Sequence, residues 1–299
     1  MKSCRRIPVR ALLAVAVLFG APARAPANDL TLRVVADSAE RSALLHLPAK
    51  FDPRRYYPVV FGFHGGLGNA EGYIANSRLF DKAEAAGFVA VCPEGTPVIG
   101  NHRVWNSGSE YVRSSRGADD VGFTRALLNA VMTRVGIDRK RVYATGFSNG
   151  GQMDYRLALE ASDIIAAIAP MSGATLSEGA EPPRPVPVMH FHGTTDTVYP
   201  FDGGLGPHSI GRTPHVPVAA VISQWVRFNH ASEAPEILSH EGWQEQMHAG
   251  TTPVVLVLVE GLGHQIAGGT DDRLPGQALR DTPDSVELAL RFFLDHPMP

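Results

Sequence analysis

The amino-acid sequence predicts an α/β fold, with a mostly parallel central sheet and helices on both of its faces. Short apolar runs, typical of strands that are buried on both sides, alternate with longer segments in which apolar residues recur at helical spacing. Reactive polar side chains follow directly after several of these runs. Because ligands of open α/β sheets lie beyond the carboxyl ends of the strands, we expect the chemistry at that edge.

The first 27 residues have the order of a secretory signal peptide. A basic segment (MKSCRRIPVR) precedes a short apolar run (ALLAVAVLF) and a stretch rich in small residues (GAPARAPAN). The apolar run is too short to cross a bilayer. We expect cleavage after Ala27, so that residues 1–27 are the signal and residues 28–299 form a single α/β domain. The mature protein is then periplasmic or extracellular.

The composition excludes several classes of partner. The full chain has 27 Lys and Arg against 30 Asp and Glu; five basic residues and no acidic ones lie in the signal, leaving 22 against 30, a net charge of −8. This acidic balance disfavours binding to nucleic acid or anionic membranes. Cys92 is the only cysteine beyond the signal, and we expect an inert buried thiol. No Cys/His cluster has zinc spacing, so we expect no metal and no other cofactor.

The first half of the chain supplies an opening hairpin and the first parallel strands. The expected strands lie at residues 30–35, 42–47, 58–63 and 88–92, and the expected helices lie within residues 70–86 and at 119–134. The third strand, PVVFGF, ends at His64. Asp119 or Asp120 stands near the start of the second helix, and we interpret the pair as a helix cap rather than as two catalytic carboxylates.

The second half continues the alternation of strands and helices. The expected strands lie at residues 142–145, 164–169, 188–191 and 254–259, and the expected helices at 151–160, 217–228 and 282–294. For the last helix we expect Thr282 at the N-cap and Pro283 at the first helical position.

The segment VYATGFSNGG, residues 142–151, carries the clearest chemical signal. Its G-x-S-x-G pattern, between a strand and a helix, is that of a nucleophile elbow. In such an elbow a sharp turn holds the serine in a strained backbone conformation, and its neighbours are glycine because a Cβ would clash with the adjacent strand or helix. We therefore expect the Ser148 hydroxyl to project into a cleft above the N-terminus of a helix.

A serine hydroxyl needs a base, and the base needs an acidic partner that fixes its tautomer. Asp196 and His264 follow later strands and give the chain order Ser, Asp, His that belongs with this elbow. We expect Ser148, Asp196 and His264 to be the catalytic triad.

Other residues near these positions carry the same functional groups. His192 precedes Asp196 and breaks the expected order, so we interpret it as a structural loop residue. Asp202 stays open as an alternative acid, whereas Glu260 lies too close to His264 in sequence to serve.

An acyl-transfer site also needs two N–H donors for the oxyanion. We expect one to be the Asn149 amide and the other the Gly66 amide, in the segment HGGLG that His64 helps to shape. A phosphate-binding loop is disfavoured because the required glycine and lysine pattern is missing. Trp105 lies in a long polar segment and is expected either to contact substrate or to pack in the core.

These motifs resemble those of the polyhydroxybutyrate depolymerase and feruloyl esterase family, which is related to carbohydrate esterase family 1. The matching segments are FHGGLGNA, VWNSG, DDVGF, GFSNGGQM, HFHGTTDTVYP and EGLGHQIAGG. The resemblance implies an α/β-hydrolase fold for residues 28–299, ester hydrolysis, and the triad Ser148, Asp196 and His264. Family members usually have tryptophan and proline after the histidine, where this chain has Ile266 and Ala267.

We therefore expect a secreted serine esterase whose partner is an ester substrate, with polyhydroxybutyrate-type polyester or its oligomers as the first candidate. Feruloyl or acetyl esters of plant cell-wall polysaccharide such as xylan are the alternative. A peptidase and a non-catalytic exported binding protein are more remote possibilities, since fold alone does not prove chemistry.

Overall fold

The computed structural model describes residues 29–108, 114–177, 179–270 and 282–299. The signal peptide expected at residues 1–27 lies outside these ranges. Among the described residues, no helix is both long and apolar enough to cross a membrane.

The described chain is built around a ten-stranded sheet in the order β1-β2-β4-β3-β7-β8-β9-β12-β11-β10. The six neighbouring strands from β4 to β12 pair in parallel, and two antiparallel strands extend the sheet at each edge. In chain order the strands are β1 (Asp29–Ala36), β2 (Ala39–His46), β3 (Tyr57–Phe63), β4 (Val89–Pro93), β7 (Ile137–Phe147), β8 (Ala167–Met171), β9 (Val188–Gly193), β10 (Glu236–His240), β11 (Trp243–His248) and β12 (Val254–Val259). The mostly parallel sheet expected from the sequence is confirmed.

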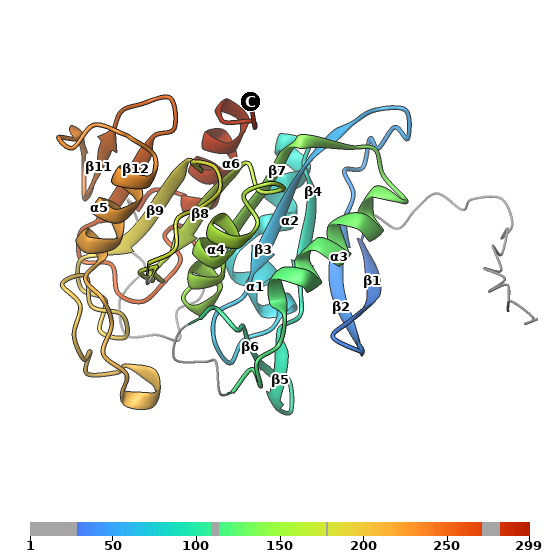
Figure 1. The fold of residues 1–299 in the computed structure, drawn as a ribbon, viewed down its shortest axis with the longest axis horizontal. Coiled ribbons are helices and arrows are strands. Elements are labelled where there is room, and N and C mark those ends of the chain that lie inside the picture. The colour runs from blue at the N-terminus through green and yellow to red at the C-terminus, as the bar shows by residue number, and fades with distance from the viewer. Residues whose placement is uncertain (1–28, 109–113, 178, 271–281) are drawn as a thin grey trace, which may run out of the picture.

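Helices cover both faces of this sheet (Figure 1). One apolar core lies beneath α3 (Asp120–Met132), α4 (Asn149–Glu160) and α5 (Val218–Phe228). A second core lies on the opposite face, beneath α1 (Ala70–Ser77), α2 (Leu79–Ala86) and α6 (Ser285–Asp295). Cys92 is a buried free thiol in this second core.

Two helix predictions need correction. The helix expected within residues 70–86 is two helices, because Arg78 adopts a left-handed conformation (φ 55°) that ends α1. The N-cap of α6 is Asp284 and not Thr282, since the Asp284 carboxylate accepts the Glu287 N–H at 3.0 Å. An N-cap side chain must reach a free N–H of the first turn, and Asp284 is the residue placed to do so.

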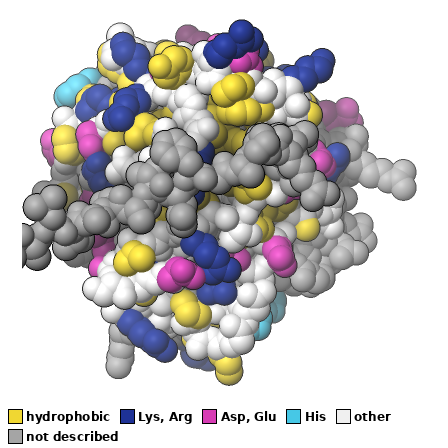
Figure 2. Space-filling model, turned by 90° about the vertical axis from the view of Figure 1, so that its right-hand side faces the viewer, with side chains coloured by type: hydrophobic (Ala, Val, Ile, Leu, Met, Phe, Trp, Pro, Cys, Tyr) yellow, Lys and Arg dark blue, Asp and Glu magenta, His cyan; other side chains and the backbone are white. Residues whose placement is uncertain are grey.

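Four strands were not predicted from the sequence. β5 (Thr96–Ile99) and β6 (His102–Val104) form a separate hairpin, while β10 and β11 lie at one edge of the main sheet. All residues of β10 are exposed, so the strand lacks the apolar run that marks a buried strand. At the opposite edge, beside β1, basic and acidic side chains are interspersed over the visible described surface (Figure 2).

Asp154, on α4, is a buried carboxyl group without exposed surface. Neither of its oxygens has a hydrogen-bond partner among the described residues. Burial raises the pKa of Asp154 well above the ordinary value, so its neutral form is favoured in the folded protein. The unfolded chain loses this proton at a lower pH, and stability is therefore highest below the ordinary pKa of aspartate and falls as the pH rises.

We expect Asp154→Asn to remove this pH-dependent loss of stability. The free energy of unfolding of the variant minus that of the unmodified protein should increase between about pH 4 and pH 8. Urea denaturation at several pH values measures the difference. A difference that stays constant over this range would show that the Asp154 carboxyl does not retain its proton in the folded state.

Candidate active site

Ser148 lies at the turn between β7 and α4, as the G-x-S-x-G pattern predicts. Its backbone is left-handed (φ 55°, ψ −118°), and its N–H donates to the Met171 carbonyl at 2.8 Å. A Cβ on Gly146 would lie 2.5 Å from the carbonyl carbon of Gly150, and one on Gly150 would lie 2.2 Å from the Phe63 oxygen. Both glycines are therefore required by close backbone packing.

His264 and Asp196 are in direct contact, although 68 positions separate them. His264 Nδ1 lies 2.7 Å from Asp196 Oδ2, and both side chains are buried. The other carboxylate oxygen accepts the N–H groups of Val198, at 2.9 Å, and Tyr199, at 2.7 Å. Burial alone would raise the pKa of Asp196, but the His264 imidazole, the nearby His192 and the Tyr199 amide outweigh it and lower the pKa below its usual value.

Asp196 is thus the carboxylate that pairs with His264, and the open alternative, Asp202, is not. Asp202 is exposed, and no contact between it and His264 is present.

Ser148 and His264 line one cavity of about 450 Å³. Most of its exposed wall is apolar, and the lining also includes Gly65, Gly66, Phe147, Thr197, Val198, His208 and Ile210. The Phe147 ring packs on the His264 imidazole, with centroids 4.8 Å apart. The cavity therefore brings a serine hydroxyl, an imidazole and the glycine loop together around space for a small ligand.

The loop after β3 holds the second candidate oxyanion donor. Gly68 donates to Gly65 at 3.0 Å, and Leu67 donates to the Arg103 carbonyl at 2.7 Å, which fixes the loop around Gly66. The N–H groups of Gly66 and Asn149 have no acceptor among the described residues. Both residues are therefore available as donors, since the first amides of a helix such as α4 have no partner within the helix.

His64 shapes this loop as a neutral imidazole. Its Nδ1–H donates to the Gly65 carbonyl at 2.8 Å, and its Nε2 accepts the Gly95 N–H at 3.1 Å. Burial, together with the nearby Arg103 and Arg41, lowers the pKa of His64 to about 4. A neutral tautomer can satisfy both bonds, so His64 acts as a structural bridge.

Trp105 is fully buried and does not line the cavity, which favours packing over contact with substrate. Its indole N–H donates to the His64 carbonyl at 2.9 Å. Its backbone exchanges two hydrogen bonds with the side chain of Asn149, at 2.7 and 3.2 Å. Trp105 therefore connects the candidate oxyanion loop after β3 to the start of α4.

Asp120 is a supporting residue that our sequence analysis missed. Asp119 caps α3 through the Gly122 N–H, as expected, whereas Asp120 is fully buried. Asp120 pairs with Arg41 at 2.6 Å and accepts the Asn106 N–H at 2.7 Å, next to Trp105. The sequence does contain a signal for this burial, because helical spacing places the Asp120 carboxylate on the apolar face of the helix.

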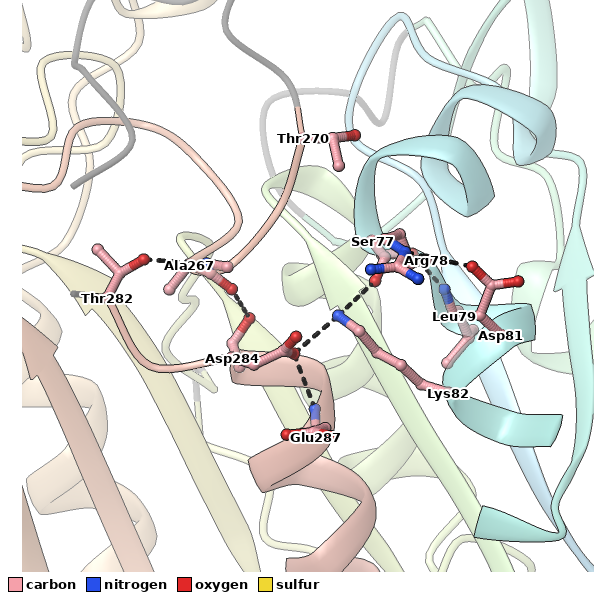
Figure 3. A network of polar contacts seen from close by, with 12 residues as sticks. Ser77, Arg78, Leu79, Asp81, Lys82, Ala267, Thr270, Thr282, Asp284 and Glu287 are labelled. Carbon is pink, nitrogen blue, oxygen red and sulfur yellow. Dashed lines mark hydrogen bonds and ion pairs between the residues drawn. The ribbon is translucent and has the colours of Figure 1, made fainter. Parts of the chain in front are cut away.

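The loop after His264 is attached to the N-terminus of α6 (Figure 3). Ser285 donates its N–H, at 3.1 Å, and its hydroxyl, at 2.8 Å, to the Ala267 carbonyl. Asp284 accepts from Lys82 of α2 at 2.7 Å. The loop that carries His264 is therefore bonded to the start of α6, which is in turn tied to α2 by the Lys82–Asp284 pair.

Among the residues that the structure describes, no group of three or more His, Cys, Asp or Glu side chains could hold a metal ion.

A parallel sheet with a serine at a strained strand-to-helix turn, and with a His–Asp pair beyond later strands, is the arrangement of the α/β-hydrolases. Solved structures of that fold are similar to this one; an acetyl xylan esterase from Aspergillus awamori has a TM-score of 0.60 at 16% identity, over 79% of this chain and 94% of that one. The chain is an esterase, a carboxylic ester hydrolase.

More closely, it belongs to the family described as "Esterase PHB depolymerase", whose model matches residues 42–239. A protein named "Putative esterase NocK" from Nocardia uniformis subsp. tsuyamanensis is 32% identical over 83% of this chain and 77% of its own. Feruloyl esterase B from Piromyces equi is 28% identical over 77% of this chain, which spans 43% of that protein. The family resemblance stated from the sequence is confirmed.

We expect Asp120→Asn to destabilise the protein by about 3–5 kcal/mol, because it leaves the Arg41 charge buried without its partner. Urea denaturation measures the free energy of unfolding. The matched control is Glu40→Gln, which removes an exposed pair with Arg33 (2.8 Å) and should cost less than about 1 kcal/mol. Equal effects of the two substitutions would contradict the structural role of the buried pair.

Proposed function

We propose that this protein is a serine esterase in which Ser148, His264 and Asp196 form the catalytic triad. The observation that carries the proposal is the 2.7 Å contact between His264 Nδ1 and Asp196 Oδ2, at a cavity that Ser148 also lines. With Nδ1–H donating to Asp196, the Nε2 of a neutral imidazole is free to act as a base.

In the proposed reaction, Ser148 Oγ attacks the ester carbonyl while His264 Nε2 takes the serine proton. His264 then gives this proton to the leaving alcohol as the carbon–oxygen bond breaks, which produces an acyl-enzyme. Water attacks the acyl-enzyme in the same way, with His264 as base, and releases the acid and the free serine. Asp196, whose pKa is lowered, stabilises the imidazolium that forms in both halves.

The negative charge on the carbonyl oxygen is stabilised by the N–H groups of Asn149 and Gly66. Asn149 opens α4, so the positive end of the helix dipole adds to its N–H. Removing one such donor typically costs about 3–4 kcal/mol of transition-state stabilisation.

For the substrate we propose a short polyester such as 3-hydroxybutyrate oligomers. The family assignment and the mainly apolar cavity wall, with Val198, Ile210 and Phe147, support this class. Feruloyl or acetyl esters of xylan are the second candidate, since several relatives are named feruloyl esterases. The leader-like segment at residues 1–27 supports secretion to the periplasm or the medium.

Ser148→Ala should reduce kcat for p-nitrophenyl butyrate by at least about 10⁴-fold, because alanine has no hydroxyl to form the acyl-enzyme. Ser223→Ala, which alters an exposed serine on α5, serves as the matched control and should keep full activity. Circular dichroism confirms folding. Full activity of Ser148→Ala would overturn the proposal.

A product assay separates the two substrate classes. We expect 3-hydroxybutyrate to be released from its oligomers with a higher kcat/KM than ferulate from methyl ferulate or acetate from acetylated xylan. The reason is that the cavity has a mainly apolar wall and a limited volume. Chromatography of the products measures each rate. A higher kcat/KM on methyl ferulate or on acetylated xylan would instead assign the enzyme to the feruloyl or acetyl esterases.

A further inference from the structure

A second histidine, His192, binds the turn that carries Asp196. The carboxylate binds its own loop through the amides of Val198 and Tyr199. The carbonyl of Tyr199 in turn accepts the Nε2–H of His192, at 2.9 Å. The same nitrogen lies 3.7 Å from Asp196 Oδ2, the oxygen that binds His264. His192 therefore contacts the loop at the point that sets the position of this oxygen.

His192 is the last member of a chain of buried hydrogen bonds. Its Nδ1 lies 3.2 Å from His190 Nε2, and His190 Nδ1 lies 3.0 Å from the Tyr155 hydroxyl. All three side chains are at most 2% exposed. His190 and His192 project from the same face of β9, and their rings stack with centroids 5.4 Å apart.

The donor and acceptor properties of these groups determine the position of each proton in this series of hydrogen bonds. A carbonyl oxygen only accepts hydrogen bonds, so the proton of His192 lies on Nε2 and its Nδ1 carries no proton. His190 must then donate from Nε2, which leaves its own Nδ1 to accept from the Tyr155 hydroxyl. Burial lowers the pKa of both histidines, so both are neutral and this single arrangement is kept. The bonds all point from Tyr155 toward the Asp196 turn.

The series of hydrogen bonds from Tyr155 to His192 joins the two halves of the proposed triad. Tyr155 lies on α4, the helix that begins directly after Ser148. The other end lies on the loop of Asp196, which binds His264. The helix of the nucleophile and the loop of the acid are thus connected through two imidazoles anchored in the central sheet.

We propose that His192, supported by His190 and Tyr155, is a positioning residue that fixes the Asp196 carboxylate relative to α4. This inference rests on the proposed triad. His192 does not touch substrate or exchange protons with it; it holds the Tyr199 carbonyl, and through that carbonyl the turn on which the His264–Asp196 contact depends.

The test compares His192→Leu with His192→Gln. The terminal amide of glutamine can donate an N–H near the place of Nε2, whereas leucine cannot. We expect His192→Leu to lower kcat on the order of 10- to 100-fold with little change in KM, because small displacements of a catalytic group cost this much. His192→Gln should recover most of the loss. His248→Leu is the matched control, since His248 is also buried and donates to a backbone carbonyl, that of Ser232, at 2.7 Å.

A measurement without turnover separates this inference from the proposed function. In the Ser148→Ala protein, the His264 Nδ1 proton should give a far-downfield NMR resonance, because it lies in a short bond to a carboxylate. Adding His192→Leu should broaden or abolish it, and adding His192→Gln should retain it. If Ser148→Ala were still active, the triad would fail while this resonance would still report on the contact.

An unchanged resonance and an unchanged kcat in folded His192→Leu would overturn the inference. If His192→Leu does not fold, Tyr155→Phe decides, because it removes only the hydroxyl at the start of the chain. It should lower kcat in the same direction by a smaller factor and broaden the same resonance. No effect on either would contradict a link between α4 and the Asp196 turn.

Discussion

The left-handed backbone of Ser148 is the constraint on which the rest of the site depends. Such a conformation at a non-glycine residue costs on the order of 1–3 kcal/mol and persists only when its surroundings enforce it. Here a backbone bond to Met171 and the close approach of Gly146, Gly150 and Gly173 enforce it. A Cβ on Gly173 would lie 1.9 Å from the Ser148 oxygen. This turn sets both the direction of the hydroxyl and the position of the Asn149 amide.

The other candidate residues lie at the same edge as this turn because of the sheet topology. β3, β7, β9 and β12 run parallel, so the loops after them share one edge, where His64, Ser148, Asp196 and His264 follow in chain order. Each loop has its own polar support: Trp105 and Asn149 next to the loop of Gly66, the half-buried Asp284–Lys82 pair at the helix that the His264 loop contacts, and His192 next to the Asp196 turn. Uncharged imidazoles are used where a hydrogen bond must be directional, since burial disfavours their charged form.

The sequence was sufficient for features that depend on local pattern. The elbow at Ser148 needs only glycines at two fixed positions between a strand and a helix, and the order of Asp196 and His264 follows from the order of the strands. Features that depend on contacts between distant segments were not predictable in the same way. The burial of Trp105 and the Asp120–Arg41 pair depend on which segments become neighbours. The edge strands β10 and β11 are stabilised by pairing with β12 rather than by an apolar run of their own.

A crystal structure of the protein after reaction with a fluorophosphonate, which imitates the tetrahedral intermediate, tests whether Ser148, His264 and the two amides act together. We expect one adduct, on Ser148 Oγ, with His264 Nε2 within hydrogen-bond distance, about 2.6–3.2 Å, of an adduct oxygen. The phosphoryl oxygen should face the N–H groups of Asn149 and Gly66. An adduct on another residue, or an imidazole of His264 turned away from it, would contradict the account.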